Sequence, residues 1–203
     1  MAKFRLTKSE LKKQREALKR FSQYLPILQL KKQQLQMEVS KLQRAVDTEK
    51  ENAEQLTQDI DRWVAVFGED VKIGDILKVE KVMTETGNIA GVDIPVFKDV
   101  DFREKEYDLL RTPLWVDRGI EVLKEMIVLR IKINILAEQI ALLRAELMVT
   151  AQRVNLFEKI KIPEARERIR KIQIFLGDLR IAAVVTGKIA KEKIHKKSLV
   201  AGS

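Results

Sequence analysis

Apolar residues in the first third of the chain recur at alternating steps of three and four. With heptad position a set at Leu11, the a and d positions continue to Phe67, and 14 of these 17 positions are apolar. A heptad held over eight repeats is typical of a coiled-coil helix. Thr7 can cap the helix start in a capping box with Glu10, and Ser9 is the alternative cap. The pattern predicts a helix within residues 1–67, in which 60 residues span roughly 90 Å.

A second heptad occupies the later part of the chain, residues 112–195. Its a and d positions run from Val122 to Phe157, and among them only Thr150 is polar. Thr112-Pro113 fits an N-cap followed by proline at the first helical position. The second segment is therefore expected to be a helix that could pair with the first.

Pro163 interrupts this second stripe. Beyond it the apolar positions resume with a shift of one residue, at Ile169, Ile172, Leu176, Leu179 and Ala183. Because proline lacks an amide N–H and clashes with the preceding turn, we expect a kink or a local unwinding here. The helix is expected to end at about His195, which leaves residues 196–203 as a tail.

Residues 68–111 differ from both heptad segments because glycines punctuate them. Ile76–Thr84 and Val92–Phe97 partly alternate and contain β-branched residues, and Thr86-Gly87-Asn88 lies between them as a turn. These signals predict one or two short β-hairpins. Pro95 favours an edge strand or a bend.

Two long helices joined by a compact insert are expected to fold back on each other. The predicted fold is dominated by α-helix: a long antiparallel two-helix coiled coil with a small β-hairpin insert at the tip and both termini at the other end. Its 45% of hydrophobic residues exclude a disordered chain. The expected core residues are Leu18, Leu28, Leu35, Leu42, Leu56, Leu129, Leu136, Ile140, Leu143 and Leu147.

Residues 126–149 hold apolar side chains outside the stripe, at Ile127, Ile131, Ile135 and Leu142. Two helices cannot cover this width. Either the core is broader where the helices pack, or another protein chain binds there.

The charges are separated by sign along the chain. Residues 1–20 have a net charge of +6, residues 158–197 of +7 and residues 47–108 of −9, within a total of +9. In an antiparallel hairpin the two basic segments meet at one end, here termed the basic foot. Its candidate binding residues are Lys8, Lys12, Lys13, Arg15, Lys188, Lys191 and Lys193. The alternative is that these charges only solvate the flanks of the coiled coil.

The chain lacks the residues that most catalytic and metal sites need. It has no cysteine and one histidine, His195, which excludes thiolate chemistry and a histidine metal cluster. Gly187-Lys188 has neither the upstream glycine nor the Ser or Thr of a phosphate-binding loop. The longest uncharged run covers residues 21–30, whereas a membrane-spanning helix needs about 20 residues. We expect no enzyme activity, cofactor, metal ion or membrane crossing.

Three functions remain open at this point. The basic foot could neutralise the phosphates of a nucleic acid. Two helices joined by β-hairpins also occur in prefoldin-type chaperones. The third possibility is a mechanical rod inside a larger machine.

Three blocks of the sequence resemble the D subunits of V-type and A-type ATP synthases. They are LTKSELKKQ at residues 6–14, NIAGVDIP at residues 88–95, and RVNLFEKIKIP at residues 153–163 with IRKI at residues 169–172. Residues 177–180 depart from the Glu-Arg-Glu run that is usual in this family. The blocks follow one another in order over nearly the whole chain.

The resemblance implies a noncatalytic central-stalk rotor subunit. Its coiled coil would enter a ring of alternating catalytic A and noncatalytic B subunits, with the basic foot as the contact. An F subunit would bind the exposed part of the rod, and a C-type (d-type) adaptor would hold the lower stalk above the membrane ring. The rotor would couple ATP synthesis or hydrolysis on the A subunits to the movement of protons or sodium ions. This implies a peripheral place on the cytoplasmic membrane face, without direct binding of nucleotide or nucleic acid.

Overall fold

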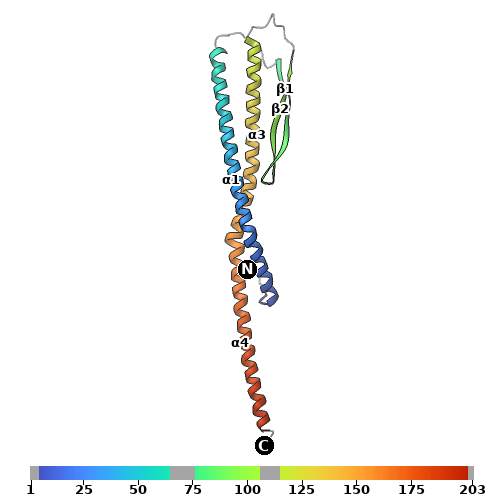
Figure 1. Ribbon diagram of the computed structural model, residues 1–203, viewed down its shortest axis with the longest axis vertical. Coiled ribbons are helices and arrows are strands. Elements are labelled where there is room, and N and C mark those ends of the chain that lie inside the picture. The colour runs from blue at the N-terminus through green and yellow to red at the C-terminus, as the bar shows by residue number, and fades with distance from the viewer. Residues whose placement is uncertain (1–4, 65–75, 106–114, 201–203) are drawn as a thin grey trace. The chain divides into compact units, whose positions relative to one another are not determined.

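Helices dominate the computed structural model, which describes residues 5–64, 76–105 and 115–200 (Figure 1). In chain order the elements are α1 (Lys8–Val64), β1 (Leu77–Ile89), β2 (Val92–Glu104), α3 (Trp115–Leu156), the π-helix η1 (Phe157–Lys161) and α4 (Ile162–Val200). The predicted fold class, helical with a small β-hairpin, is confirmed. The expected Thr112-Pro113 cap and the a position at Phe67 lie outside the described residues.

The chain divides into two compact units. The middle unit contains residues 31–150, and the terminal unit contains residues 1–30 together with residues 151–203. Helix α1 contributes to both units, and so does α3.

Thr7 caps the start of α1, as the sequence predicts. The backbone N–H of Glu10 donates to Thr7 Oγ1 at 3.2 Å, and the N–H of Leu11 donates to the Thr7 carbonyl at 3.0 Å. The Glu10 carboxylate accepts a hydrogen bond from Gln14 Nε2 at 2.8 Å. The cap therefore satisfies N–H groups that the first helical turn leaves without a partner.

Burial along the helices follows the two heptads. Every a and d position from Leu11 to Ile60, and from Val122 to Phe157, is buried or partly buried. Leu35 and Leu143 are completely buried, and Ile140 is 6% exposed. The remaining expected core residues are partly buried: Leu18, Leu28, Leu42, Leu56, Leu129, Leu136 and Leu147.

A single π-turn accounts for the shift of the apolar stripe near Pro163. In η1 the N–H of Ile162 bonds to the carbonyl of Phe157, five residues back. Such a turn holds one extra residue, so the buried positions continue after it at Ile162, Ala165 and Ile172. The predicted local unwinding is thus observed, although the helix resumes at once and contains Pro163 in its first turn.

Helix α4 is longer than the part of α1 that can pair with it. Phe21 of α1 stacks on Phe157 with ring centroids 5.3 Å apart. Counting in opposite directions from this pair brings Lys8 level with about residue 170. Because α4 continues to Val200, it extends about 45 Å further. The start of α1 and the end of α4 therefore do not meet, contrary to the expectation for an antiparallel hairpin, and α4 continues beyond the expected end at about His195.

Within its described residues, 76–105, the insert forms one hairpin, which agrees with the expectation of one or two. Strands β1 and β2 pair antiparallel from Leu77↔Glu104 to Ile89↔Val92, with two bulges. The turn is at Ala90-Gly91, both with positive φ (52° and 80°), and not at Thr86-Gly87-Asn88 as the sequence predicts. Asn88 supports it, since its Oδ1 accepts the N–H of Gly91 at 3.0 Å. Pro95 lies on an edge strand, as expected, because both strands of this sheet are edges.

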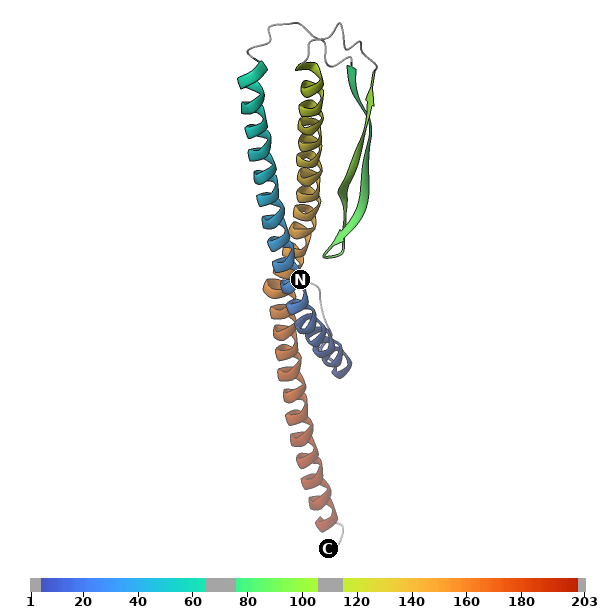
Figure 2. The ribbon, with the colours of Figure 1, turned by 45° about the horizontal axis from the view of Figure 1, so that its top comes forward.

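Within the middle unit the hairpin lies back along α3 instead of forming a separate tip (Figure 1, Figure 2). Leu77 shares a buried cluster with Val116 and Ile120 of α3. At the turn end, Ile94 shares a second cluster with Leu35 of α1 and Leu143 of α3.

The hairpin also covers part of the extra apolar width of α3. Ile127 packs on the first of these clusters, and Ile135 is 8% exposed. Leu142 remains 39% exposed. The hairpin of the same chain thus contributes to the broader core around Ile127.

Candidate functional site

The described residues bring together no group of three metal-ligating side chains from His, Cys, Asp or Glu. None of the helices described is apolar over a stretch long enough to cross a bilayer. Glu104 forms an ion pair with Lys124, and His195 lies exposed on α4. The described helices also present grooves and exposed surfaces.

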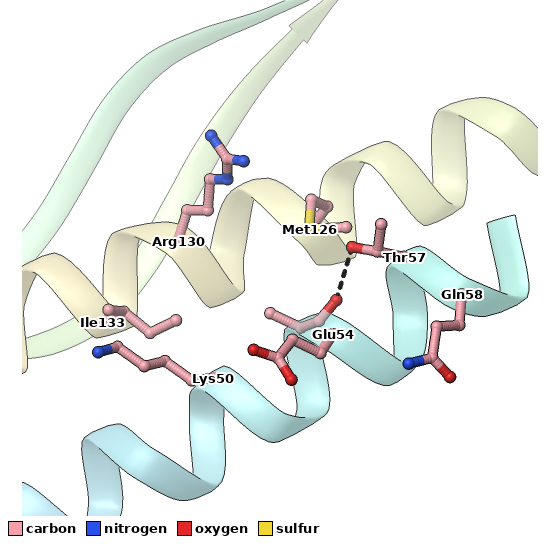
Figure 3. A pocket seen from close by; sticks show the side chains of 8 residues that line it. Lys50, Glu54, Thr57, Gln58, Met126, Arg130 and Ile133 are labelled. Carbon is pink, nitrogen blue, oxygen red and sulfur yellow. Dashed lines mark hydrogen bonds between the residues drawn. The ribbon is translucent and has the colours of Figure 1, made fainter. Parts of the chain in front are cut away.

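An open groove of about 450 Å³ lies between α1 and α3 in the middle unit. Figure 3 shows the labelled side chains that line it: Lys50, Glu54, Thr57 and Gln58 come from α1, and Met126, Arg130 and Ile133 come from α3. Thr57 Oγ1 donates to the carbonyl of Ala53 at 2.8 Å. All eight lining residues are inside helices, whose N–H groups are bonded along the helix. The groove thus lacks the free N–H groups with which helix N-termini and glycine-rich loops bind phosphate.

The first half of the basic foot lies on the opening turns of α1. Lys8, Lys12, Lys13 and Arg15 are all exposed. Lys12 approaches Glu16 to 4.0 Å with 81% of its side chain exposed. Such a surface pair contributes little to stability, so these cations remain accessible to a partner.

The second half of the foot lies further along α4. Lys188, Lys191 and Lys193 are exposed, but they follow the level of Lys8 by about 18 residues or more, which is roughly 27 Å of helix. The structure therefore does not bring the two halves together at one level. The basic residues nearer to the start of α1 include Lys171, which donates to Glu167 at 2.5 Å. This hydrogen bond and the charge of Lys171 lower the pKa of the Glu167 carboxyl.

The distal part of α4 is the surface that the sequence pattern did not reveal. Leu179 and Ala183 were expected to resume the buried stripe, but both are exposed. The large apolar side chains there are between 38% and 69% exposed, at Ile174, Phe175, Leu179, Ile181, Val184, Val185, Ile189 and Ile194. These side chains are exposed because they lie beyond the level of Lys8, where α1 begins, when residues are counted from the Phe21–Phe157 pair.

At about 100° per residue these side chains are distributed around α4 and do not form one face. A helix that is apolar on all sides is normally enclosed by other protein. Lysines at Lys188, Lys191 and Lys193 stand among them. The distal α4 thus combines the apolar surface of a buried helix with exposed lysine side chains.

A second polar feature that the sequence analysis missed lies beside the hairpin turn. Lys31 Nζ of α1 is 2.7 Å from Glu146 Oε1 of α3. The same carboxylate oxygen is 3.5 Å from Thr150 Oγ1, and Thr150 is 1% exposed. Gln139, 5% exposed, donates to the Pro95 carbonyl of β2. The Lys31–Glu146 and Gln139–Pro95 contacts join elements far apart in the chain, which no local spacing indicates.

Comparison with known proteins identifies the family of this chain. The family model for the D subunit of ATP synthase matches residues 10–192. The chain is 46% identical to a V-type ATP synthase D subunit from Borreliella burgdorferi over 198 residues, which cover 98% of each chain. It is 33% identical to the V-type ATP synthase D subunit from Chlamydia caviae, over 97% of this chain and 96% of the relative. Since both the family model and these relatives span nearly the whole sequence, the chain belongs to the family of ATP synthase D subunits.

Proposed function

We propose that this protein is the central rotor of a V/A-type ATP synthase and that its distal α4 turns inside a ring of A and B subunits. Membership of the D-subunit family makes the chain a noncatalytic stalk subunit of such a complex. In this role it couples ATP synthesis or hydrolysis in the A/B head to rotation, and thereby to proton or sodium transport.

The observation that carries the proposal is the exposure of apolar side chains around the distal α4. Burying one side chain such as Ile181 or Leu179 contributes about 1.5–3 kcal/mol relative to leaving it in water. A partner that touched only one side would leave the other apolar side chains solvated. A ring that encloses the helix buries them all.

The basic foot supports the same arrangement through electrostatics. Long, hydrated lysine side chains on α1 and α4 can make several similar contacts with an acidic lining. A shaft must turn without becoming locked at one angle, and such contacts do not favour a single angle strongly. Because the basic segment of α1 and that of α4 lie at different levels along the axis of α4, the proposal predicts contacts at two heights in the ring.

The finer partners follow from the family. We infer that an F subunit binds the part of the coiled coil outside the ring and that a C/d-type adaptor connects the stalk to the membrane ring. The chain would then be peripheral on the cytoplasmic membrane face, with no direct nucleotide contact.

Co-purification tests this function. The tagged full chain and two variants would be captured from native membranes: Ile181→Asp with Val184→Asp, and the matched control Asp178→Ala, a polar change on the same helix. We expect A and B subunits with the wild type and the control, and their loss with the double variant. Elution of nucleic acid or unfolded polypeptides in place of A and B subunits would support the nucleic-acid or chaperone function instead.

A further inference from the structure

The a and d positions of the middle unit do not by themselves determine how far α1 lies along α3. In α1 they are mostly aliphatic, from Leu35 through Val46 to Ile60. Sliding α1 by one heptad, about 10 Å, would again bring apolar residues against apolar residues. In coiled coils, polar contacts usually specify the register.

Two polar contacts between α1 and α3 lie at the surface of the described helices. Arg144 Nη2 donates to Gln43 Oε1 at 3.3 Å, on the surface. The pair between Lys31 and Glu146 is shorter, at 2.7 Å, and both side chains are about one third exposed. Exposed pairs of this kind contribute little, so neither of these two pairs holds the register strongly.

The hairpin is attached to α3 along its length. Leu77 packs on Val116 and Ile120 near its open end, and Glu104 forms an ion pair with Lys124. Further along, Lys132 Nζ lies 5.6 Å from the centre of the Phe97 ring, and Gln139 donates to the Pro95 carbonyl. These contacts give the turn a defined height on α3.

At that height the turn contacts α1. Ile94 is 3% exposed and packs with Leu35 of α1 as well as with Leu143 of α3, and Ile89, Ala90 and Val92 complete this cluster. A Cβ on Gly91 would stand 4.0 Å from Lys31 Nζ. The turn therefore packs against side chains from both helices.

The turn itself departs from local preference. Ala90 has φ of 52°, a region that glycine and asparagine occupy more readily than alanine. A type of turn with two positive φ values usually contains Asn-Gly or Gly-Gly. The small apolar side chain of Ala90 instead packs on the cluster of Leu35 and Leu143, so packing against the helices takes precedence over turn chemistry.

We propose that the hairpin fixes the axial register of α1 against α3. The hairpin is attached along α3, and its turn contacts α1 at Lys31 and Leu35. This inference rests on the middle unit alone and not on the proposed function. Without the packing of the turn on α1, the two helices would still pair through their heptads, but in more than one register.

The chain has no cysteine, so two introduced cysteines can carry spin labels without background. Lys41→Cys on α1 and Glu125→Cys on α3 are exposed positions well separated along the helices. The distance between labels, measured by pulsed electron resonance on the isolated full chain, reports the register. We expect one narrow distance in the wild type and a second population shifted by several ångströms, up to about 10 Å, in Ile94→Ser.

Val96→Ser is the matched control, on the same strand at a residue 39% exposed, and should keep the single distance. Replacement of residues 71–110 by a Gly/Ser linker is the second variant and should broaden the distances at unchanged helical content. A single wild-type distance in the linker variant would overturn the proposal. So would equal broadening in Val96→Ser and Ile94→Ser, or loss of helical content in the linker variant, which would mean that the hairpin is required for pairing itself.

Discussion

Phe21 of α1 and Phe157 of η1 stack with ring centroids 5.3 Å apart and planes inclined by 26°, at the residue where the helical register changes. After this pair the π-turn adds one residue, and Pro163 follows it. Removing one residue inside η1 restores a continuous heptad, with Ile162, Ala165 and Ile172 still facing α1. The π-turn is therefore a one-residue insertion that accommodates Pro163, since the proline ring would clash with the preceding turn of a regular α-helix.

This relationship predicts opposite results for two single-residue deletions in a Pro163→Ala background. Deletion of Lys159 in η1 should leave the melting temperature within a few degrees of that background. Deletion of Arg170 should lower it, because Ile172, completely buried, turns by about 100° away from α1. The expected cost is about 2–3 kcal/mol. Thermal unfolding followed by circular dichroism checks this, and equal losses for the two deletions would refute the role assigned to the π-turn.

The helical core of the middle unit should not tolerate a charge. Leu35→Asp places an unpaired carboxylate at a completely buried site, at an expected cost of several kcal/mol. Leu136→Asp should cost less, since Leu136 is partly exposed. Lys41→Ala, at an exposed position on α1, is the control and should change the melting temperature little. The heptad register is wrong if Leu35→Asp and Lys41→Ala melt alike.

Charge reversal in the basic foot should weaken association with the A/B ring. Changing Lys12, Lys13, Arg15, Lys191 and Lys193 to Glu alters the charge by ten units. Affinity and its salt dependence should both fall, because screening acts on fewer attractive pairs. The changes on α1 and those on α4 should contribute independently, since their sites lie far apart. Binding that is equally strong at low and high salt, in wild type and variant alike, would exclude an electrostatic contact.

The hairpin should modulate the enzyme without being required for assembly. Replacing residues 71–110 with a Gly/Ser linker removes the contacts of Leu77 and Ile94 but leaves both heptads in place. We expect a soluble helical protein, less stable than the wild type, that still enters the ring. ATP hydrolysis by the assembled head should change in rate without being abolished. A rate equal to that of the wild type would mean that the hairpin only closes the chain between the helices, and failure to enter the ring would contradict the separation of shaft and insert.

The helices were predictable because their signals are local. Heptads, the Thr7 cap and the one-residue slip before Ile169 can all be read from neighbouring residues, and the slip correctly indicated an unwound turn. The hairpin turn was not predictable in the same way. Thr86-Gly87-Asn88 has the stronger local turn signal, yet Ala90 adopts the positive φ because its side chain packs on helices distant in the sequence.

The candidate surfaces were predictable in part. Net charge identified the basic segments but not their separation along α4, which depends on where α1 begins. The apolar distal α4 looked like a continued core stripe at Leu179 and Ala183, because a periodic pattern does not reveal whether a partner helix is present. Its exposure became visible only from the pairing of Phe21 with Phe157.

Rotation of this chain inside the A/B ring is the most direct test of its role. Glu80→Cys, on the exposed β1, would carry a bead as the only cysteine of the chain, in a complex fixed to a surface through its A or B subunits. With ATP we predict continuous rotation of the bead in one direction, at a rate that follows ATP hydrolysis. A bead that stays still while the same complexes hydrolyse ATP would contradict the rotor function.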